Sequence, residues 1–362
     1  MKILQIMPTV SFGDAVSSDA RALHRVISEM GFQTGIYAEN IDPRLSGDKT
    51  IDFVSKLPHT TDEDIIIFHH STGTKLCEML PKIKGHKLMI YHNITPPQFF
   101  SGYSRSAERI TKLGYENTLS VRSYIEYAIA DSEYNARELR KMGYECPIDV
   151  RPVLIPFADY EKAPDEDMLK RYSDGYVNIV FVGRIAPNKC QQDVIAAFAY
   201  YKKHIEPRSR LILVGSDSGM EQYGNSLKNY VNVLSLDDVV FTGHISFPAI
   251  LACYKAADVF LCMSEHEGFC VPLVEAMFFG VPIIAYNSSA VGGTLGGAGI
   301  LTDSKDPVFT ARLIDRVIHD NELRSKLISD GKKRLEDFSY ERVRSLFTSQ
   351  LNGFISKMGV SK

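Results

Sequence analysis

Short runs of apolar residues alternate with amphipathic stretches along this chain. A short apolar run fits a strand buried on both faces, and apolar residues at every third or fourth position fit a helix packed on a sheet. The pattern predicts strands near residues 3–7, 33–38, 65–69, 87–91, 127–130 and 149–154, and again near 177–182, 210–214, 239–241, 258–262, 282–285 and 299–301. It predicts helices near 15–30, 73–82, 106–113, 117–124 and 133–141, then near 189–204, 219–234, 246–255, 271–279, 307–319, 321–333 and 339–357. This alternation is typical of α/β proteins with parallel sheets.

The length of the chain predicts more than one domain. At 362 residues it exceeds an ordinary single core and fits two domains of roughly 150–200 residues each. The stretch 156–167 contains two prolines and several acidic residues and predicts the crossing between them. We therefore expect one domain over residues 1–156 and a second over 157–338.

Composition and charge exclude several classes of protein. Apolar residues make up 44% of the chain and the net charge is −3, without a basic run, so we expect a well-packed soluble protein and no nucleic-acid partner. The cysteines are scattered without a CxxC pair, which predicts reduced core thiols: Cys77, Cys146, Cys190, Cys253, Cys262 and Cys270. The N-terminal apolar run is too short for a signal peptide, and no stretch approaches the roughly 20 apolar residues of a spanning helix. These features predict a cytoplasmic protein.

One segment after the predicted strand 258–262 carries two acidic residues around a helix start. Glu267 lies in the turn, Pro272 stands near the first helical position, and Glu275 lies one to two turns into the helix. Proline suits that start because it lacks the N–H that would have no partner there, and Gly280 suits the end. A helix start attracts anions, so the segment predicts a site for a phosphorylated ligand. The alternative is a solvated turn acid and a salt bridge on the helix surface.

A second segment follows the predicted strand 177–182 and carries two cations. Gly183 allows the chain to turn off the strand, and Arg184 and Lys189 then lie within one loop before a helix. Guanidinium and ammonium groups both bind phosphate oxygens, and fixed cations lower the barrier when a diphosphate departs as an anion. The alternative is two solvated surface charges.

Together the two segments resemble the motifs of the GT4 family of retaining glycosyltransferases. Glu267 and Glu275 match its E-x7-E signature, and the stretch from Gly183 to Lys189 matches its G-R-x-x-x-x-K segment. The resemblance implies an α/β GT-B fold, in which two Rossmann-like doubly wound domains face each other across a cleft. It also implies that the C-terminal helical stretch, about residues 339–362, packs back on the first, acceptor-side domain, while the second domain binds the nucleotide sugar.

The resemblance further implies roles for individual residues of the second domain. Arg184 and Lys189 would hold the diphosphate of the donor, and Glu275 would bind the nucleotide ribose. Glu267 would lie beside the donor sugar and support charge at its anomeric carbon. The remaining donor contacts would come from main-chain groups, at Gly183, Gly268, Phe269, Cys270 and Val271. Relatives often have a glutamate in or near the turn at 289–299, and this chain has none, so turn chemistry explains most of its glycines.

Two polar residues of the first domain follow predicted strands. His92 comes after the strand 87–91 and matches a family histidine whose imidazole or backbone carbonyl contacts the donor sugar. The alternative is a structural histidine. Asp131 comes after the strand 127–130 and precedes a helix. For Asp131 we expect a helix cap or a hydrogen bond within the loop.

Other residues of the first domain are candidates for contacts with phosphate or with the acceptor. No G-x-G-x-x-G follows the first strand, which argues against a nicotinamide cofactor. Many family members have two glycines there that touch phosphate and acceptor, and this chain has Gly13 followed by Asp14. Asp14 is a candidate for binding an acceptor hydroxyl. His69 and His70, at another strand end, are candidates for lining the acceptor pocket.

The resemblance implies a hexosyltransferase that works without a metal or cofactor, since the cation pair neutralises the leaving group and no His, Asp or Cys cluster has metal-ligand spacing. The donor would be a GDP-, UDP- or dTDP-linked sugar and the acceptor a saccharide or lipid-linked saccharide in cell-surface polysaccharide synthesis. Alternatives are a GT-B nucleotide-sugar epimerase or phosphorylase and a non-catalytic binding protein. A cationic excess in residues 75–141 favours either peripheral contact with the inner face of the membrane or a solvated surface.

Overall fold

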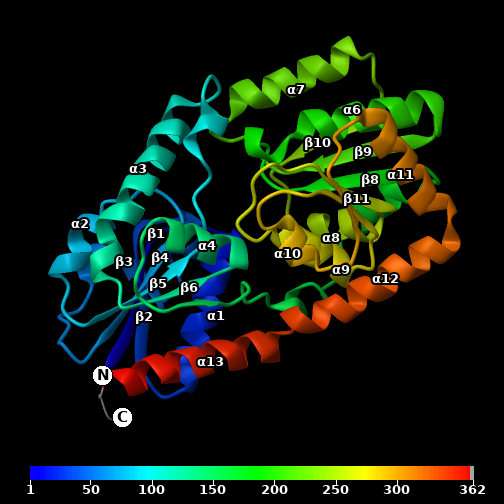
Figure 1. Cartoon of the computed structure of the whole chain (residues 1–362). Helices are drawn as coiled ribbons and strands as arrows, with labels where there is room; N and C mark the ends of the chain where they lie inside the picture. Colours follow the sequence, from blue (N-terminus) through cyan, green and yellow to red (C-terminus); the bar gives the residue numbers. More distant parts are fainter. Residues whose placement is uncertain (359–362) are drawn as a thin grey trace. The chain divides into compact units, whose positions relative to one another are not determined.

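In the computed structural model, which describes residues 1–358, the chain forms two compact units (Figure 1). Unit 1 comprises Met1–Pro97, Arg109–Phe157 and the C-terminal segment from Phe338, and unit 2 comprises Gln98–Glu108 and Ala158–Asp337. Residues 359–362 of the predicted C-terminal stretch lie outside the described residues.

Unit 1 is built on a parallel sheet of seven strands in the order β3-β2-β1-β4-β5-β6-β7. The strands are β1 (Lys2–Val10), β2 (Gln33–Ile41), β3 (Ile51–Phe53), β4 (Ile65–His70), β5 (His86–Tyr91), β6 (Tyr127–Ala130) and β7 (Ile148–Val150). Its helices are α1 (Ala15–Glu29), α2 (Leu76–Met79), α3 (Arg105–Val121), α4 (Glu133–Lys141) and α13 (Tyr340–Lys357), and the first turn of α3 belongs to unit 2. Helix α13 buries Phe347 and Leu351 in one apolar cluster with Leu23 and Ile27 of α1.

Unit 2 is built on a six-stranded parallel sheet in the order β10-β9-β8-β11-β12-β13. The strands are β8 (Val177–Val182), β9 (Ser209–Val214), β10 (Val239–Gly243), β11 (Val259–Cys262), β12 (Ile283–Tyr286) and β13 (Ile300–Thr302). The helices are α5 (Glu166–Tyr172), α6 (Gln191–His204), α7 (Glu221–Val233), α8 (Phe247–Lys255), α9 (Val271–Phe278), α10 (Val291–Leu295), α11 (Pro307–His319) and α12 (Asn321–Leu335). The α/β class and the GT-B type of fold predicted from the sequence are thereby confirmed.

The strand order reverses once in each sheet, between β1 and β4 in unit 1 and between β8 and β11 in unit 2. In doubly wound sheets, ligands bind at the carboxyl ends of the strands next to such a reversal. The candidate residues Gly13, His70, Arg184 and Glu267 all lie at or after the ends of these four strands. The topology therefore places the predicted motifs at the position where each sheet is open to a ligand.

The structure corrects several predicted elements. Residues 106–113 and 117–124 were expected as two helices, but α3 is continuous through Gly114. That glycine serves close packing, because a Cβ there would lie 3.0 Å from the amide nitrogen of Gly73 and 2.9 Å from Cδ1 of Ile94. The short elements β3, α5 and α10 were missed, and β7 ends at Val150 where a strand to residue 154 was expected. Each missed element is too short to show a period in the sequence.

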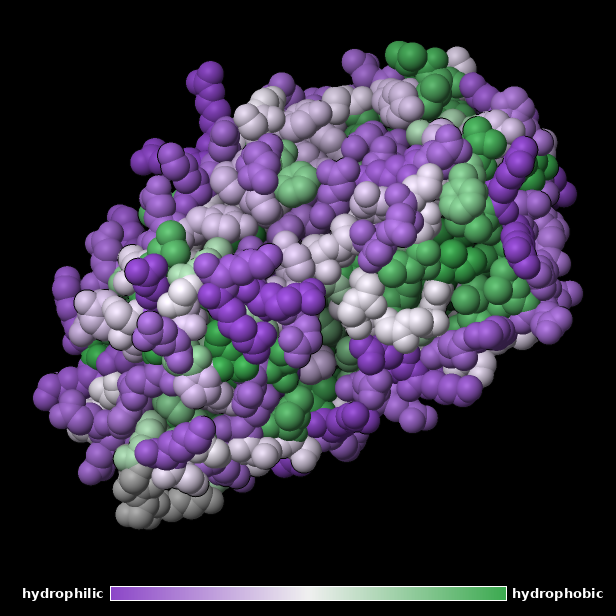
Figure 2. All heavy atoms as spheres, viewed as in Figure 1, coloured by the Kyte–Doolittle hydropathy of each residue, from purple (hydrophilic) through white to green (hydrophobic). Residues whose placement is uncertain are grey.

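Hydrophilic side chains cover most of the face seen in Figure 2, and hydrophobic ones gather there in smaller patches. Within residues 1–358, no helix has the length and apolar content required to cross a membrane.

Candidate active site

Three neighbouring strands of unit 2 are followed or ended by glycine. Gly183 and Gly215 directly follow β8 and β9, with φ of 151° and 150°, and Gly243 ends β10 with φ of 65°. A Cβ at Gly215 would lie 1.9 Å from the carbonyl oxygen of Gly183, so only glycine allows these strand ends to approach as they do. Arg184 directly follows Gly183. Its side chain is exposed, and its guanidinium has no carboxylate partner among the described residues.

The second cation of this loop, Lys189, makes an ion pair with Glu267. Its Nζ lies 2.5 Å from Oε2 of Glu267, whose side chain is 8% exposed. Burial alone lowers the pKa of Lys189, but the Glu267 carboxylate outweighs it, and the pKa is raised above its usual value. The structure therefore brings together two sequence-predicted residues that lie far apart in the chain, and holds the lysine in its charged form.

Asn188, which sequence reasoning missed, joins the two loops that carry this pair. Its side-chain amide donates to the carbonyl oxygen of His266 at 3.0 Å, and its own carbonyl oxygen accepts from the amide of Glu265 at 2.9 Å. Asn188 is buried. Its place within the G-R-x-x-x-x-K segment, directly before the lysine, was the only available sign of this role.

The glycine-rich turn at 289–299 supports the same loop from its other side. Ser289 Oγ accepts from the amide of Glu267 at 2.7 Å, and Thr294 Oγ1 donates to the carbonyl oxygen of Phe269. Cys270 then adopts φ of 72° directly before α9, and Pro272 stands at the helix start, as predicted. Hydrogen bonds from the loop that carries Asn188 and from the turn at 289–299 thus support the E-x7-E loop. The glycines of the turn did not indicate this supporting role.

Glu275, within α9, is held by two tyrosine hydroxyls. Tyr160 donates to Oε1 at 2.7 Å and Tyr254 donates to Oε2 at 2.6 Å. Burial raises the pKa of Glu275, and the two hydroxyls offset part of that effect. Each carboxylate oxygen keeps a second lone pair, so a pair of vicinal ligand hydroxyls can still bind. Neither tyrosine was identified from the sequence, because Tyr160 is 115 residues from its partner.

In unit 1, Gly13 and Asp14 follow β1. Gly13 is exposed, with φ of 82°. Asp14 is the N-cap of α1: Oδ1 accepts from the amide of Ser17 at 2.9 Å and Oδ2 accepts from its hydroxyl at 2.5 Å. Capping accounts for the position of Asp14 without an acceptor contact.

The histidines at the end of β4 are completely buried. His69 and His70 both have 0% exposure. Burial lowers the pKa of His69 to about 3 and that of His70 to about 4, so both are neutral at pH 7. His70 Nε2 bonds to Thr118 Oγ1 at 2.8 Å. In this conformation neither side chain reaches a surface at which an acceptor could bind, so their position does not support the expected pocket-lining role.

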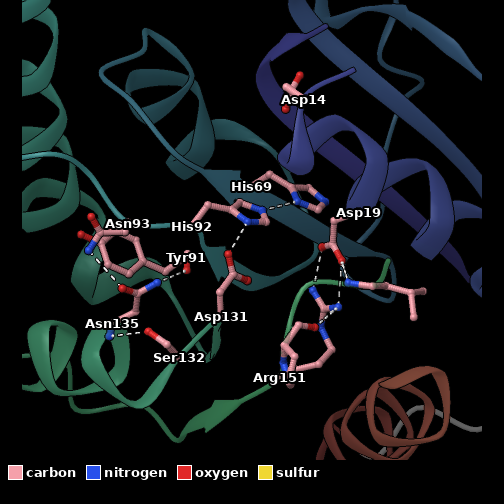
Figure 3. A network of polar contacts seen from close by, with 12 residues as sticks. Asp14, Asp19, His69, Tyr91, His92, Asn93, Asp131, Ser132, Asn135 and Arg151 are labelled. Atoms are coloured by element: carbon pink, nitrogen blue, oxygen red, sulfur yellow. Dashed lines mark hydrogen bonds and ion pairs between the residues drawn. The ribbon is translucent and has the colours of Figure 1, made fainter. Parts of the chain in front are cut away.

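His92 takes part in a chain of hydrogen bonds that runs through the interior of unit 1 (Figure 3). Gln5 Nε2 donates to the carbonyl oxygen of Ala20, which leaves Gln5 Oε1 to accept from His69 Nε2 at 2.8 Å. His69 is neutral, so its Nδ1 has no proton and accepts from His92 Nε2 at 2.9 Å. His92 Nδ1 in turn faces Asp131 Oδ2 at 2.8 Å.

This chain determines the protonation of His92. Its Nε2 must donate to His69, and its Nδ1 needs a second proton to bond with the Asp131 carboxylate, so His92 is an imidazolium ion paired with Asp131. Burial alone lowers the pKa of His92, and Asp131 reverses this, so the pKa is raised. The side chain is 1% exposed. With both ring nitrogens bonded, contact with a ligand is left to the backbone carbonyl of His92.

Asp131 is therefore not the helix cap that the sequence led us to expect. Ser132 caps α4, accepting from the amide of Asn135 at 3.2 Å, and Asp131 instead binds His92, which directly follows the neighbouring strand β5. The expectation of a cap was one residue off, because both residue types cap helices and only the packing decides between them.

A buried ion pair missed by sequence reasoning lies close to this chain (Figure 3). Arg151 donates from Nη1 and Nη2 to the two oxygens of Asp19 at 2.9 and 2.7 Å, and both residues have 0% exposure. Asp19 also accepts from the amide of Leu154 at 2.8 Å. This pair anchors the segment that leaves β7 onto α1.

Comparison with known proteins finds similarity to glycosyltransferases. Residues 170–334 match the family described as Glycosyl transferases group 1. A D-inositol 3-phosphate glycosyltransferase of Salinispora arenicola is 29% identical over 47% of this chain and 40% of its own length. The capsular polysaccharide biosynthesis glycosyltransferase CapM of Staphylococcus aureus is 28% identical over 53% of this chain and 50% of its own. The match thus spans half or less of these relatives.

The fold of the chain is similar to that of a solved structure. Anabaena Alr3699/HepE in complex with UDP-glucose superposes with a TM-score of 0.78 at 18% identity, covering 98% of this chain and 100% of the other. At that identity the likeness establishes the fold alone.

Proposed function

Because residues 170–334 match the group 1 glycosyltransferase family, we propose that the chain is a retaining hexosyltransferase that uses a nucleotide diphosphate sugar. The observation that carries the proposal is the Lys189–Glu267 ion pair, next to the second cation of the same loop, Arg184, which is exposed without a carboxylate partner among the described residues. A cation left without a carboxylate at the end of a central strand is suited to an anionic ligand.

In this proposal, Arg184 and Lys189 bind the diphosphate and stabilise the charge that develops as it leaves. Arg184 offers a planar fork to two phosphate oxygens, and Lys189 adds a point charge whose position Glu267 determines. Glu267 lies beside the donor sugar, and the acceptor hydroxyl attacks the anomeric carbon from the face that the diphosphate leaves. The two fixed cations take the part that a divalent metal plays in other enzymes of this chemistry.

Glu275 binds the ribose hydroxyls, with the second lone pairs of its oxygens, while Tyr160 and Tyr254 hold the carboxylate in place. In unit 1, the family resemblance assigns donor contacts to Gly13 and the backbone carbonyl of His92. The His92 imidazolium has no free lone pair and cannot take the acceptor proton, so the departing phosphate is the base.

The acceptor is a saccharide or lipid-linked saccharide in cell-surface polysaccharide synthesis, which the name of the relative CapM supports. Contact with the inner face of a membrane would involve α3, where Ile110 and Leu113 are 42% and 40% exposed and directly follow the exposed cations Arg109 and Lys112. Sedimentation with vesicles that contain anionic lipid tests that contact, and Lys112→Glu should weaken it.

The first experiment measures thermal stabilisation by GDP, UDP and dTDP and their sugars. Wild type is compared with Arg184→Ala, Glu275→Gln and the control Arg316→Ala, a cation on α11 that is 69% exposed. We expect one nucleoside diphosphate to stabilise wild type and the control, and to lose at least ten-fold in affinity in the other two variants. If no nucleotide stabilises wild type, or Arg184→Ala binds as wild type does, the donor site is not the one described.

The second experiment uses the sugar nucleotide chosen by the first and follows the anomeric configuration of the product by NMR. Retention of configuration in a product that requires an added acceptor supports the transferase. Conversion of the donor to an epimer without any acceptor would instead establish the epimerase alternative.

A further inference from the structure

Two buried thiols and a buried carboxylate meet where the E-x7-E loop leaves its strand. They belong to Cys262, the last residue of β11, to Cys270, directly before α9, and to Glu267 in the loop between them. The ligand atoms of all three lie within 4.8 Å of one another. Their exposures are 1%, 7% and 7%. The cluster combines two soft ligands with one hard ligand in a site that is closed from most sides.

The loop holds these ligands in place. Cys270 is fixed in a left-handed conformation, and the amide of Glu267 and the carbonyl of Phe269 are bonded to Ser289 and Thr294. Cys262 is the end of a central strand and contacts Ser264 Oγ at 3.4 Å. The three ligand atoms therefore lie close together on backbone that is held in place, which lowers the cost of binding an ion.

Among residues 1–358, two other clusters have comparable spacing, but they contain fewer thiols and pair with protein cations. Asp19, near His69 and His92, binds the guanidinium of Arg151 through both oxygens. In the group of Cys190, Asp193 and Glu265, Lys305 Nζ bonds to one oxygen of each carboxylate, at 2.7 and 2.8 Å, and there is a single thiol. Neither group offers two thiols.

The cluster at Cys262 differs because it contains two thiols, and its neighbouring cation, Lys189, balances the charge that binding would leave. Among the described residues, Lys189 bonds to Oε2 of Glu267. Two thiolates and a carboxylate carry three negative charges, and a divalent ion together with Lys189 neutralises all three. Thiolate ligands select zinc and similar soft ions over magnesium or calcium.

We propose that Cys262, Cys270 and Glu267 bind one thiophilic divalent cation of the Zn²⁺ class. On binding, two metal–sulfur bonds and one metal–oxygen bond form, the two thiol protons pass to solvent, and water completes the coordination. No redox change is involved. Because the ion takes the carboxylate that the proposed function assigns to the donor sugar, it inhibits transfer and is not a cofactor for it.

The test uses cobalt as a spectroscopic probe on the reduced full-length protein. We expect one equivalent of Co²⁺ to give a thiolate-to-cobalt charge-transfer band that one equivalent of Zn²⁺ abolishes. Cys270→Ser should roughly halve the band and weaken binding at least ten-fold. The control is Cys253→Ser, because Cys253 is equally buried but contacts Met168. The control should keep the full band.

A second variant tests the site even if the cysteine-to-serine variants misfold. Glu267→Gln keeps both thiols and the shape of the loop, so it should keep the band and bind Co²⁺ at least several-fold more weakly. A wild-type protein without a charge-transfer band, or a band that Cys270→Ser leaves unchanged in a folded protein, overturns the proposal.

The inhibitory effect is measured separately from binding. If the chain transfers sugar as proposed, Zn²⁺ should inhibit wild type and the Cys253→Ser control, a chelator should restore activity, and Cys262→Ser should resist inhibition. If transfer is never detected, the proposed function fails while the cobalt spectrum still decides the metal site. Strong spectroscopic binding without inhibition would overturn the inhibitory role.

Discussion

Replacing Asp131 by asparagine removes the negative charge that keeps His92 protonated, with almost no change in shape. In wild type, His92 donates to His69 through Nε2 and to Asp131 through Nδ1. In the variant the amide can donate to Nδ1, so every hydrogen bond is kept while His92 becomes neutral. The change therefore separates the contribution of the buried charge pair from that of packing.

The magnitude follows from the linkage between protonation and folding. The pKa of His92 is raised above 6.5 in the folded protein, so its contribution to stability is complete below pH 6.5 and is lost as the pH rises through the folded value. We expect Asp131→Asn to lower the free energy of unfolding by about 1–3 kcal/mol at pH 6. That difference should shrink by about 1.4 kcal/mol per pH unit until the folded pKa is reached.

The assay is urea unfolding, followed by circular dichroism, of both proteins between pH 5.5 and 9 at constant ionic strength, on the order of 0.1 M. The other charged or titratable groups near His92, namely His69, Asp19 and Arg151, are common to both proteins, so their contributions cancel in the difference. A control, Ser132→Ala, removes the adjacent helix cap and should cost about 1 kcal/mol at every pH. Parallel curves for wild type and Asp131→Asn would refute the assignment of His92 as an imidazolium ion.

Three further substitutions test the donor side of unit 2. Gly215→Ala places a Cβ 1.9 Å from the carbonyl oxygen of Gly183, so we expect a loss of about 3 kcal/mol or more in urea unfolding, and a change below 1 kcal/mol would contradict the strand-end geometry. Asn188→Ala removes a buried hydrogen bond between two loops and should cost about 1–3 kcal/mol by the same measurement, with a neutral result showing that the loops do not depend on it. Tyr160→Phe removes one of two hydroxyls from Glu275 and should weaken nucleoside diphosphate binding about five-fold in calorimetry. Unchanged affinity would separate Glu275 from the ribose.

Much of the fold could be predicted because it depends on local patterns. Apolar runs such as 65–69 and 258–262 can be satisfied only inside a sheet covered on both faces, and parallel strands bring their carboxyl ends to one edge. Residues shortly after such runs therefore had to lie at the edge formed by the carboxyl ends of the strands, whatever the strand order. Arg184 follows the run 177–182, and Glu267 follows the run 258–262. The boundaries of the short elements β3, α5 and α10 escaped because so few residues show no period.

The partners of the site residues were decided by tertiary structure alone. Tyr160 reaches Glu275 across 115 positions, and Arg151 reaches Asp19 across 132, because the strand order brings distant loops together and no local pattern encodes that order. Position alone marked His69 and His92 as ligand contacts, yet packing buries both rings and makes one of them an imidazolium ion. The sequence by itself thus determined which strand ends carry polar side chains. Burial and pairing, which depend on every element packed around a residue, determined which of their atoms remain available to a ligand.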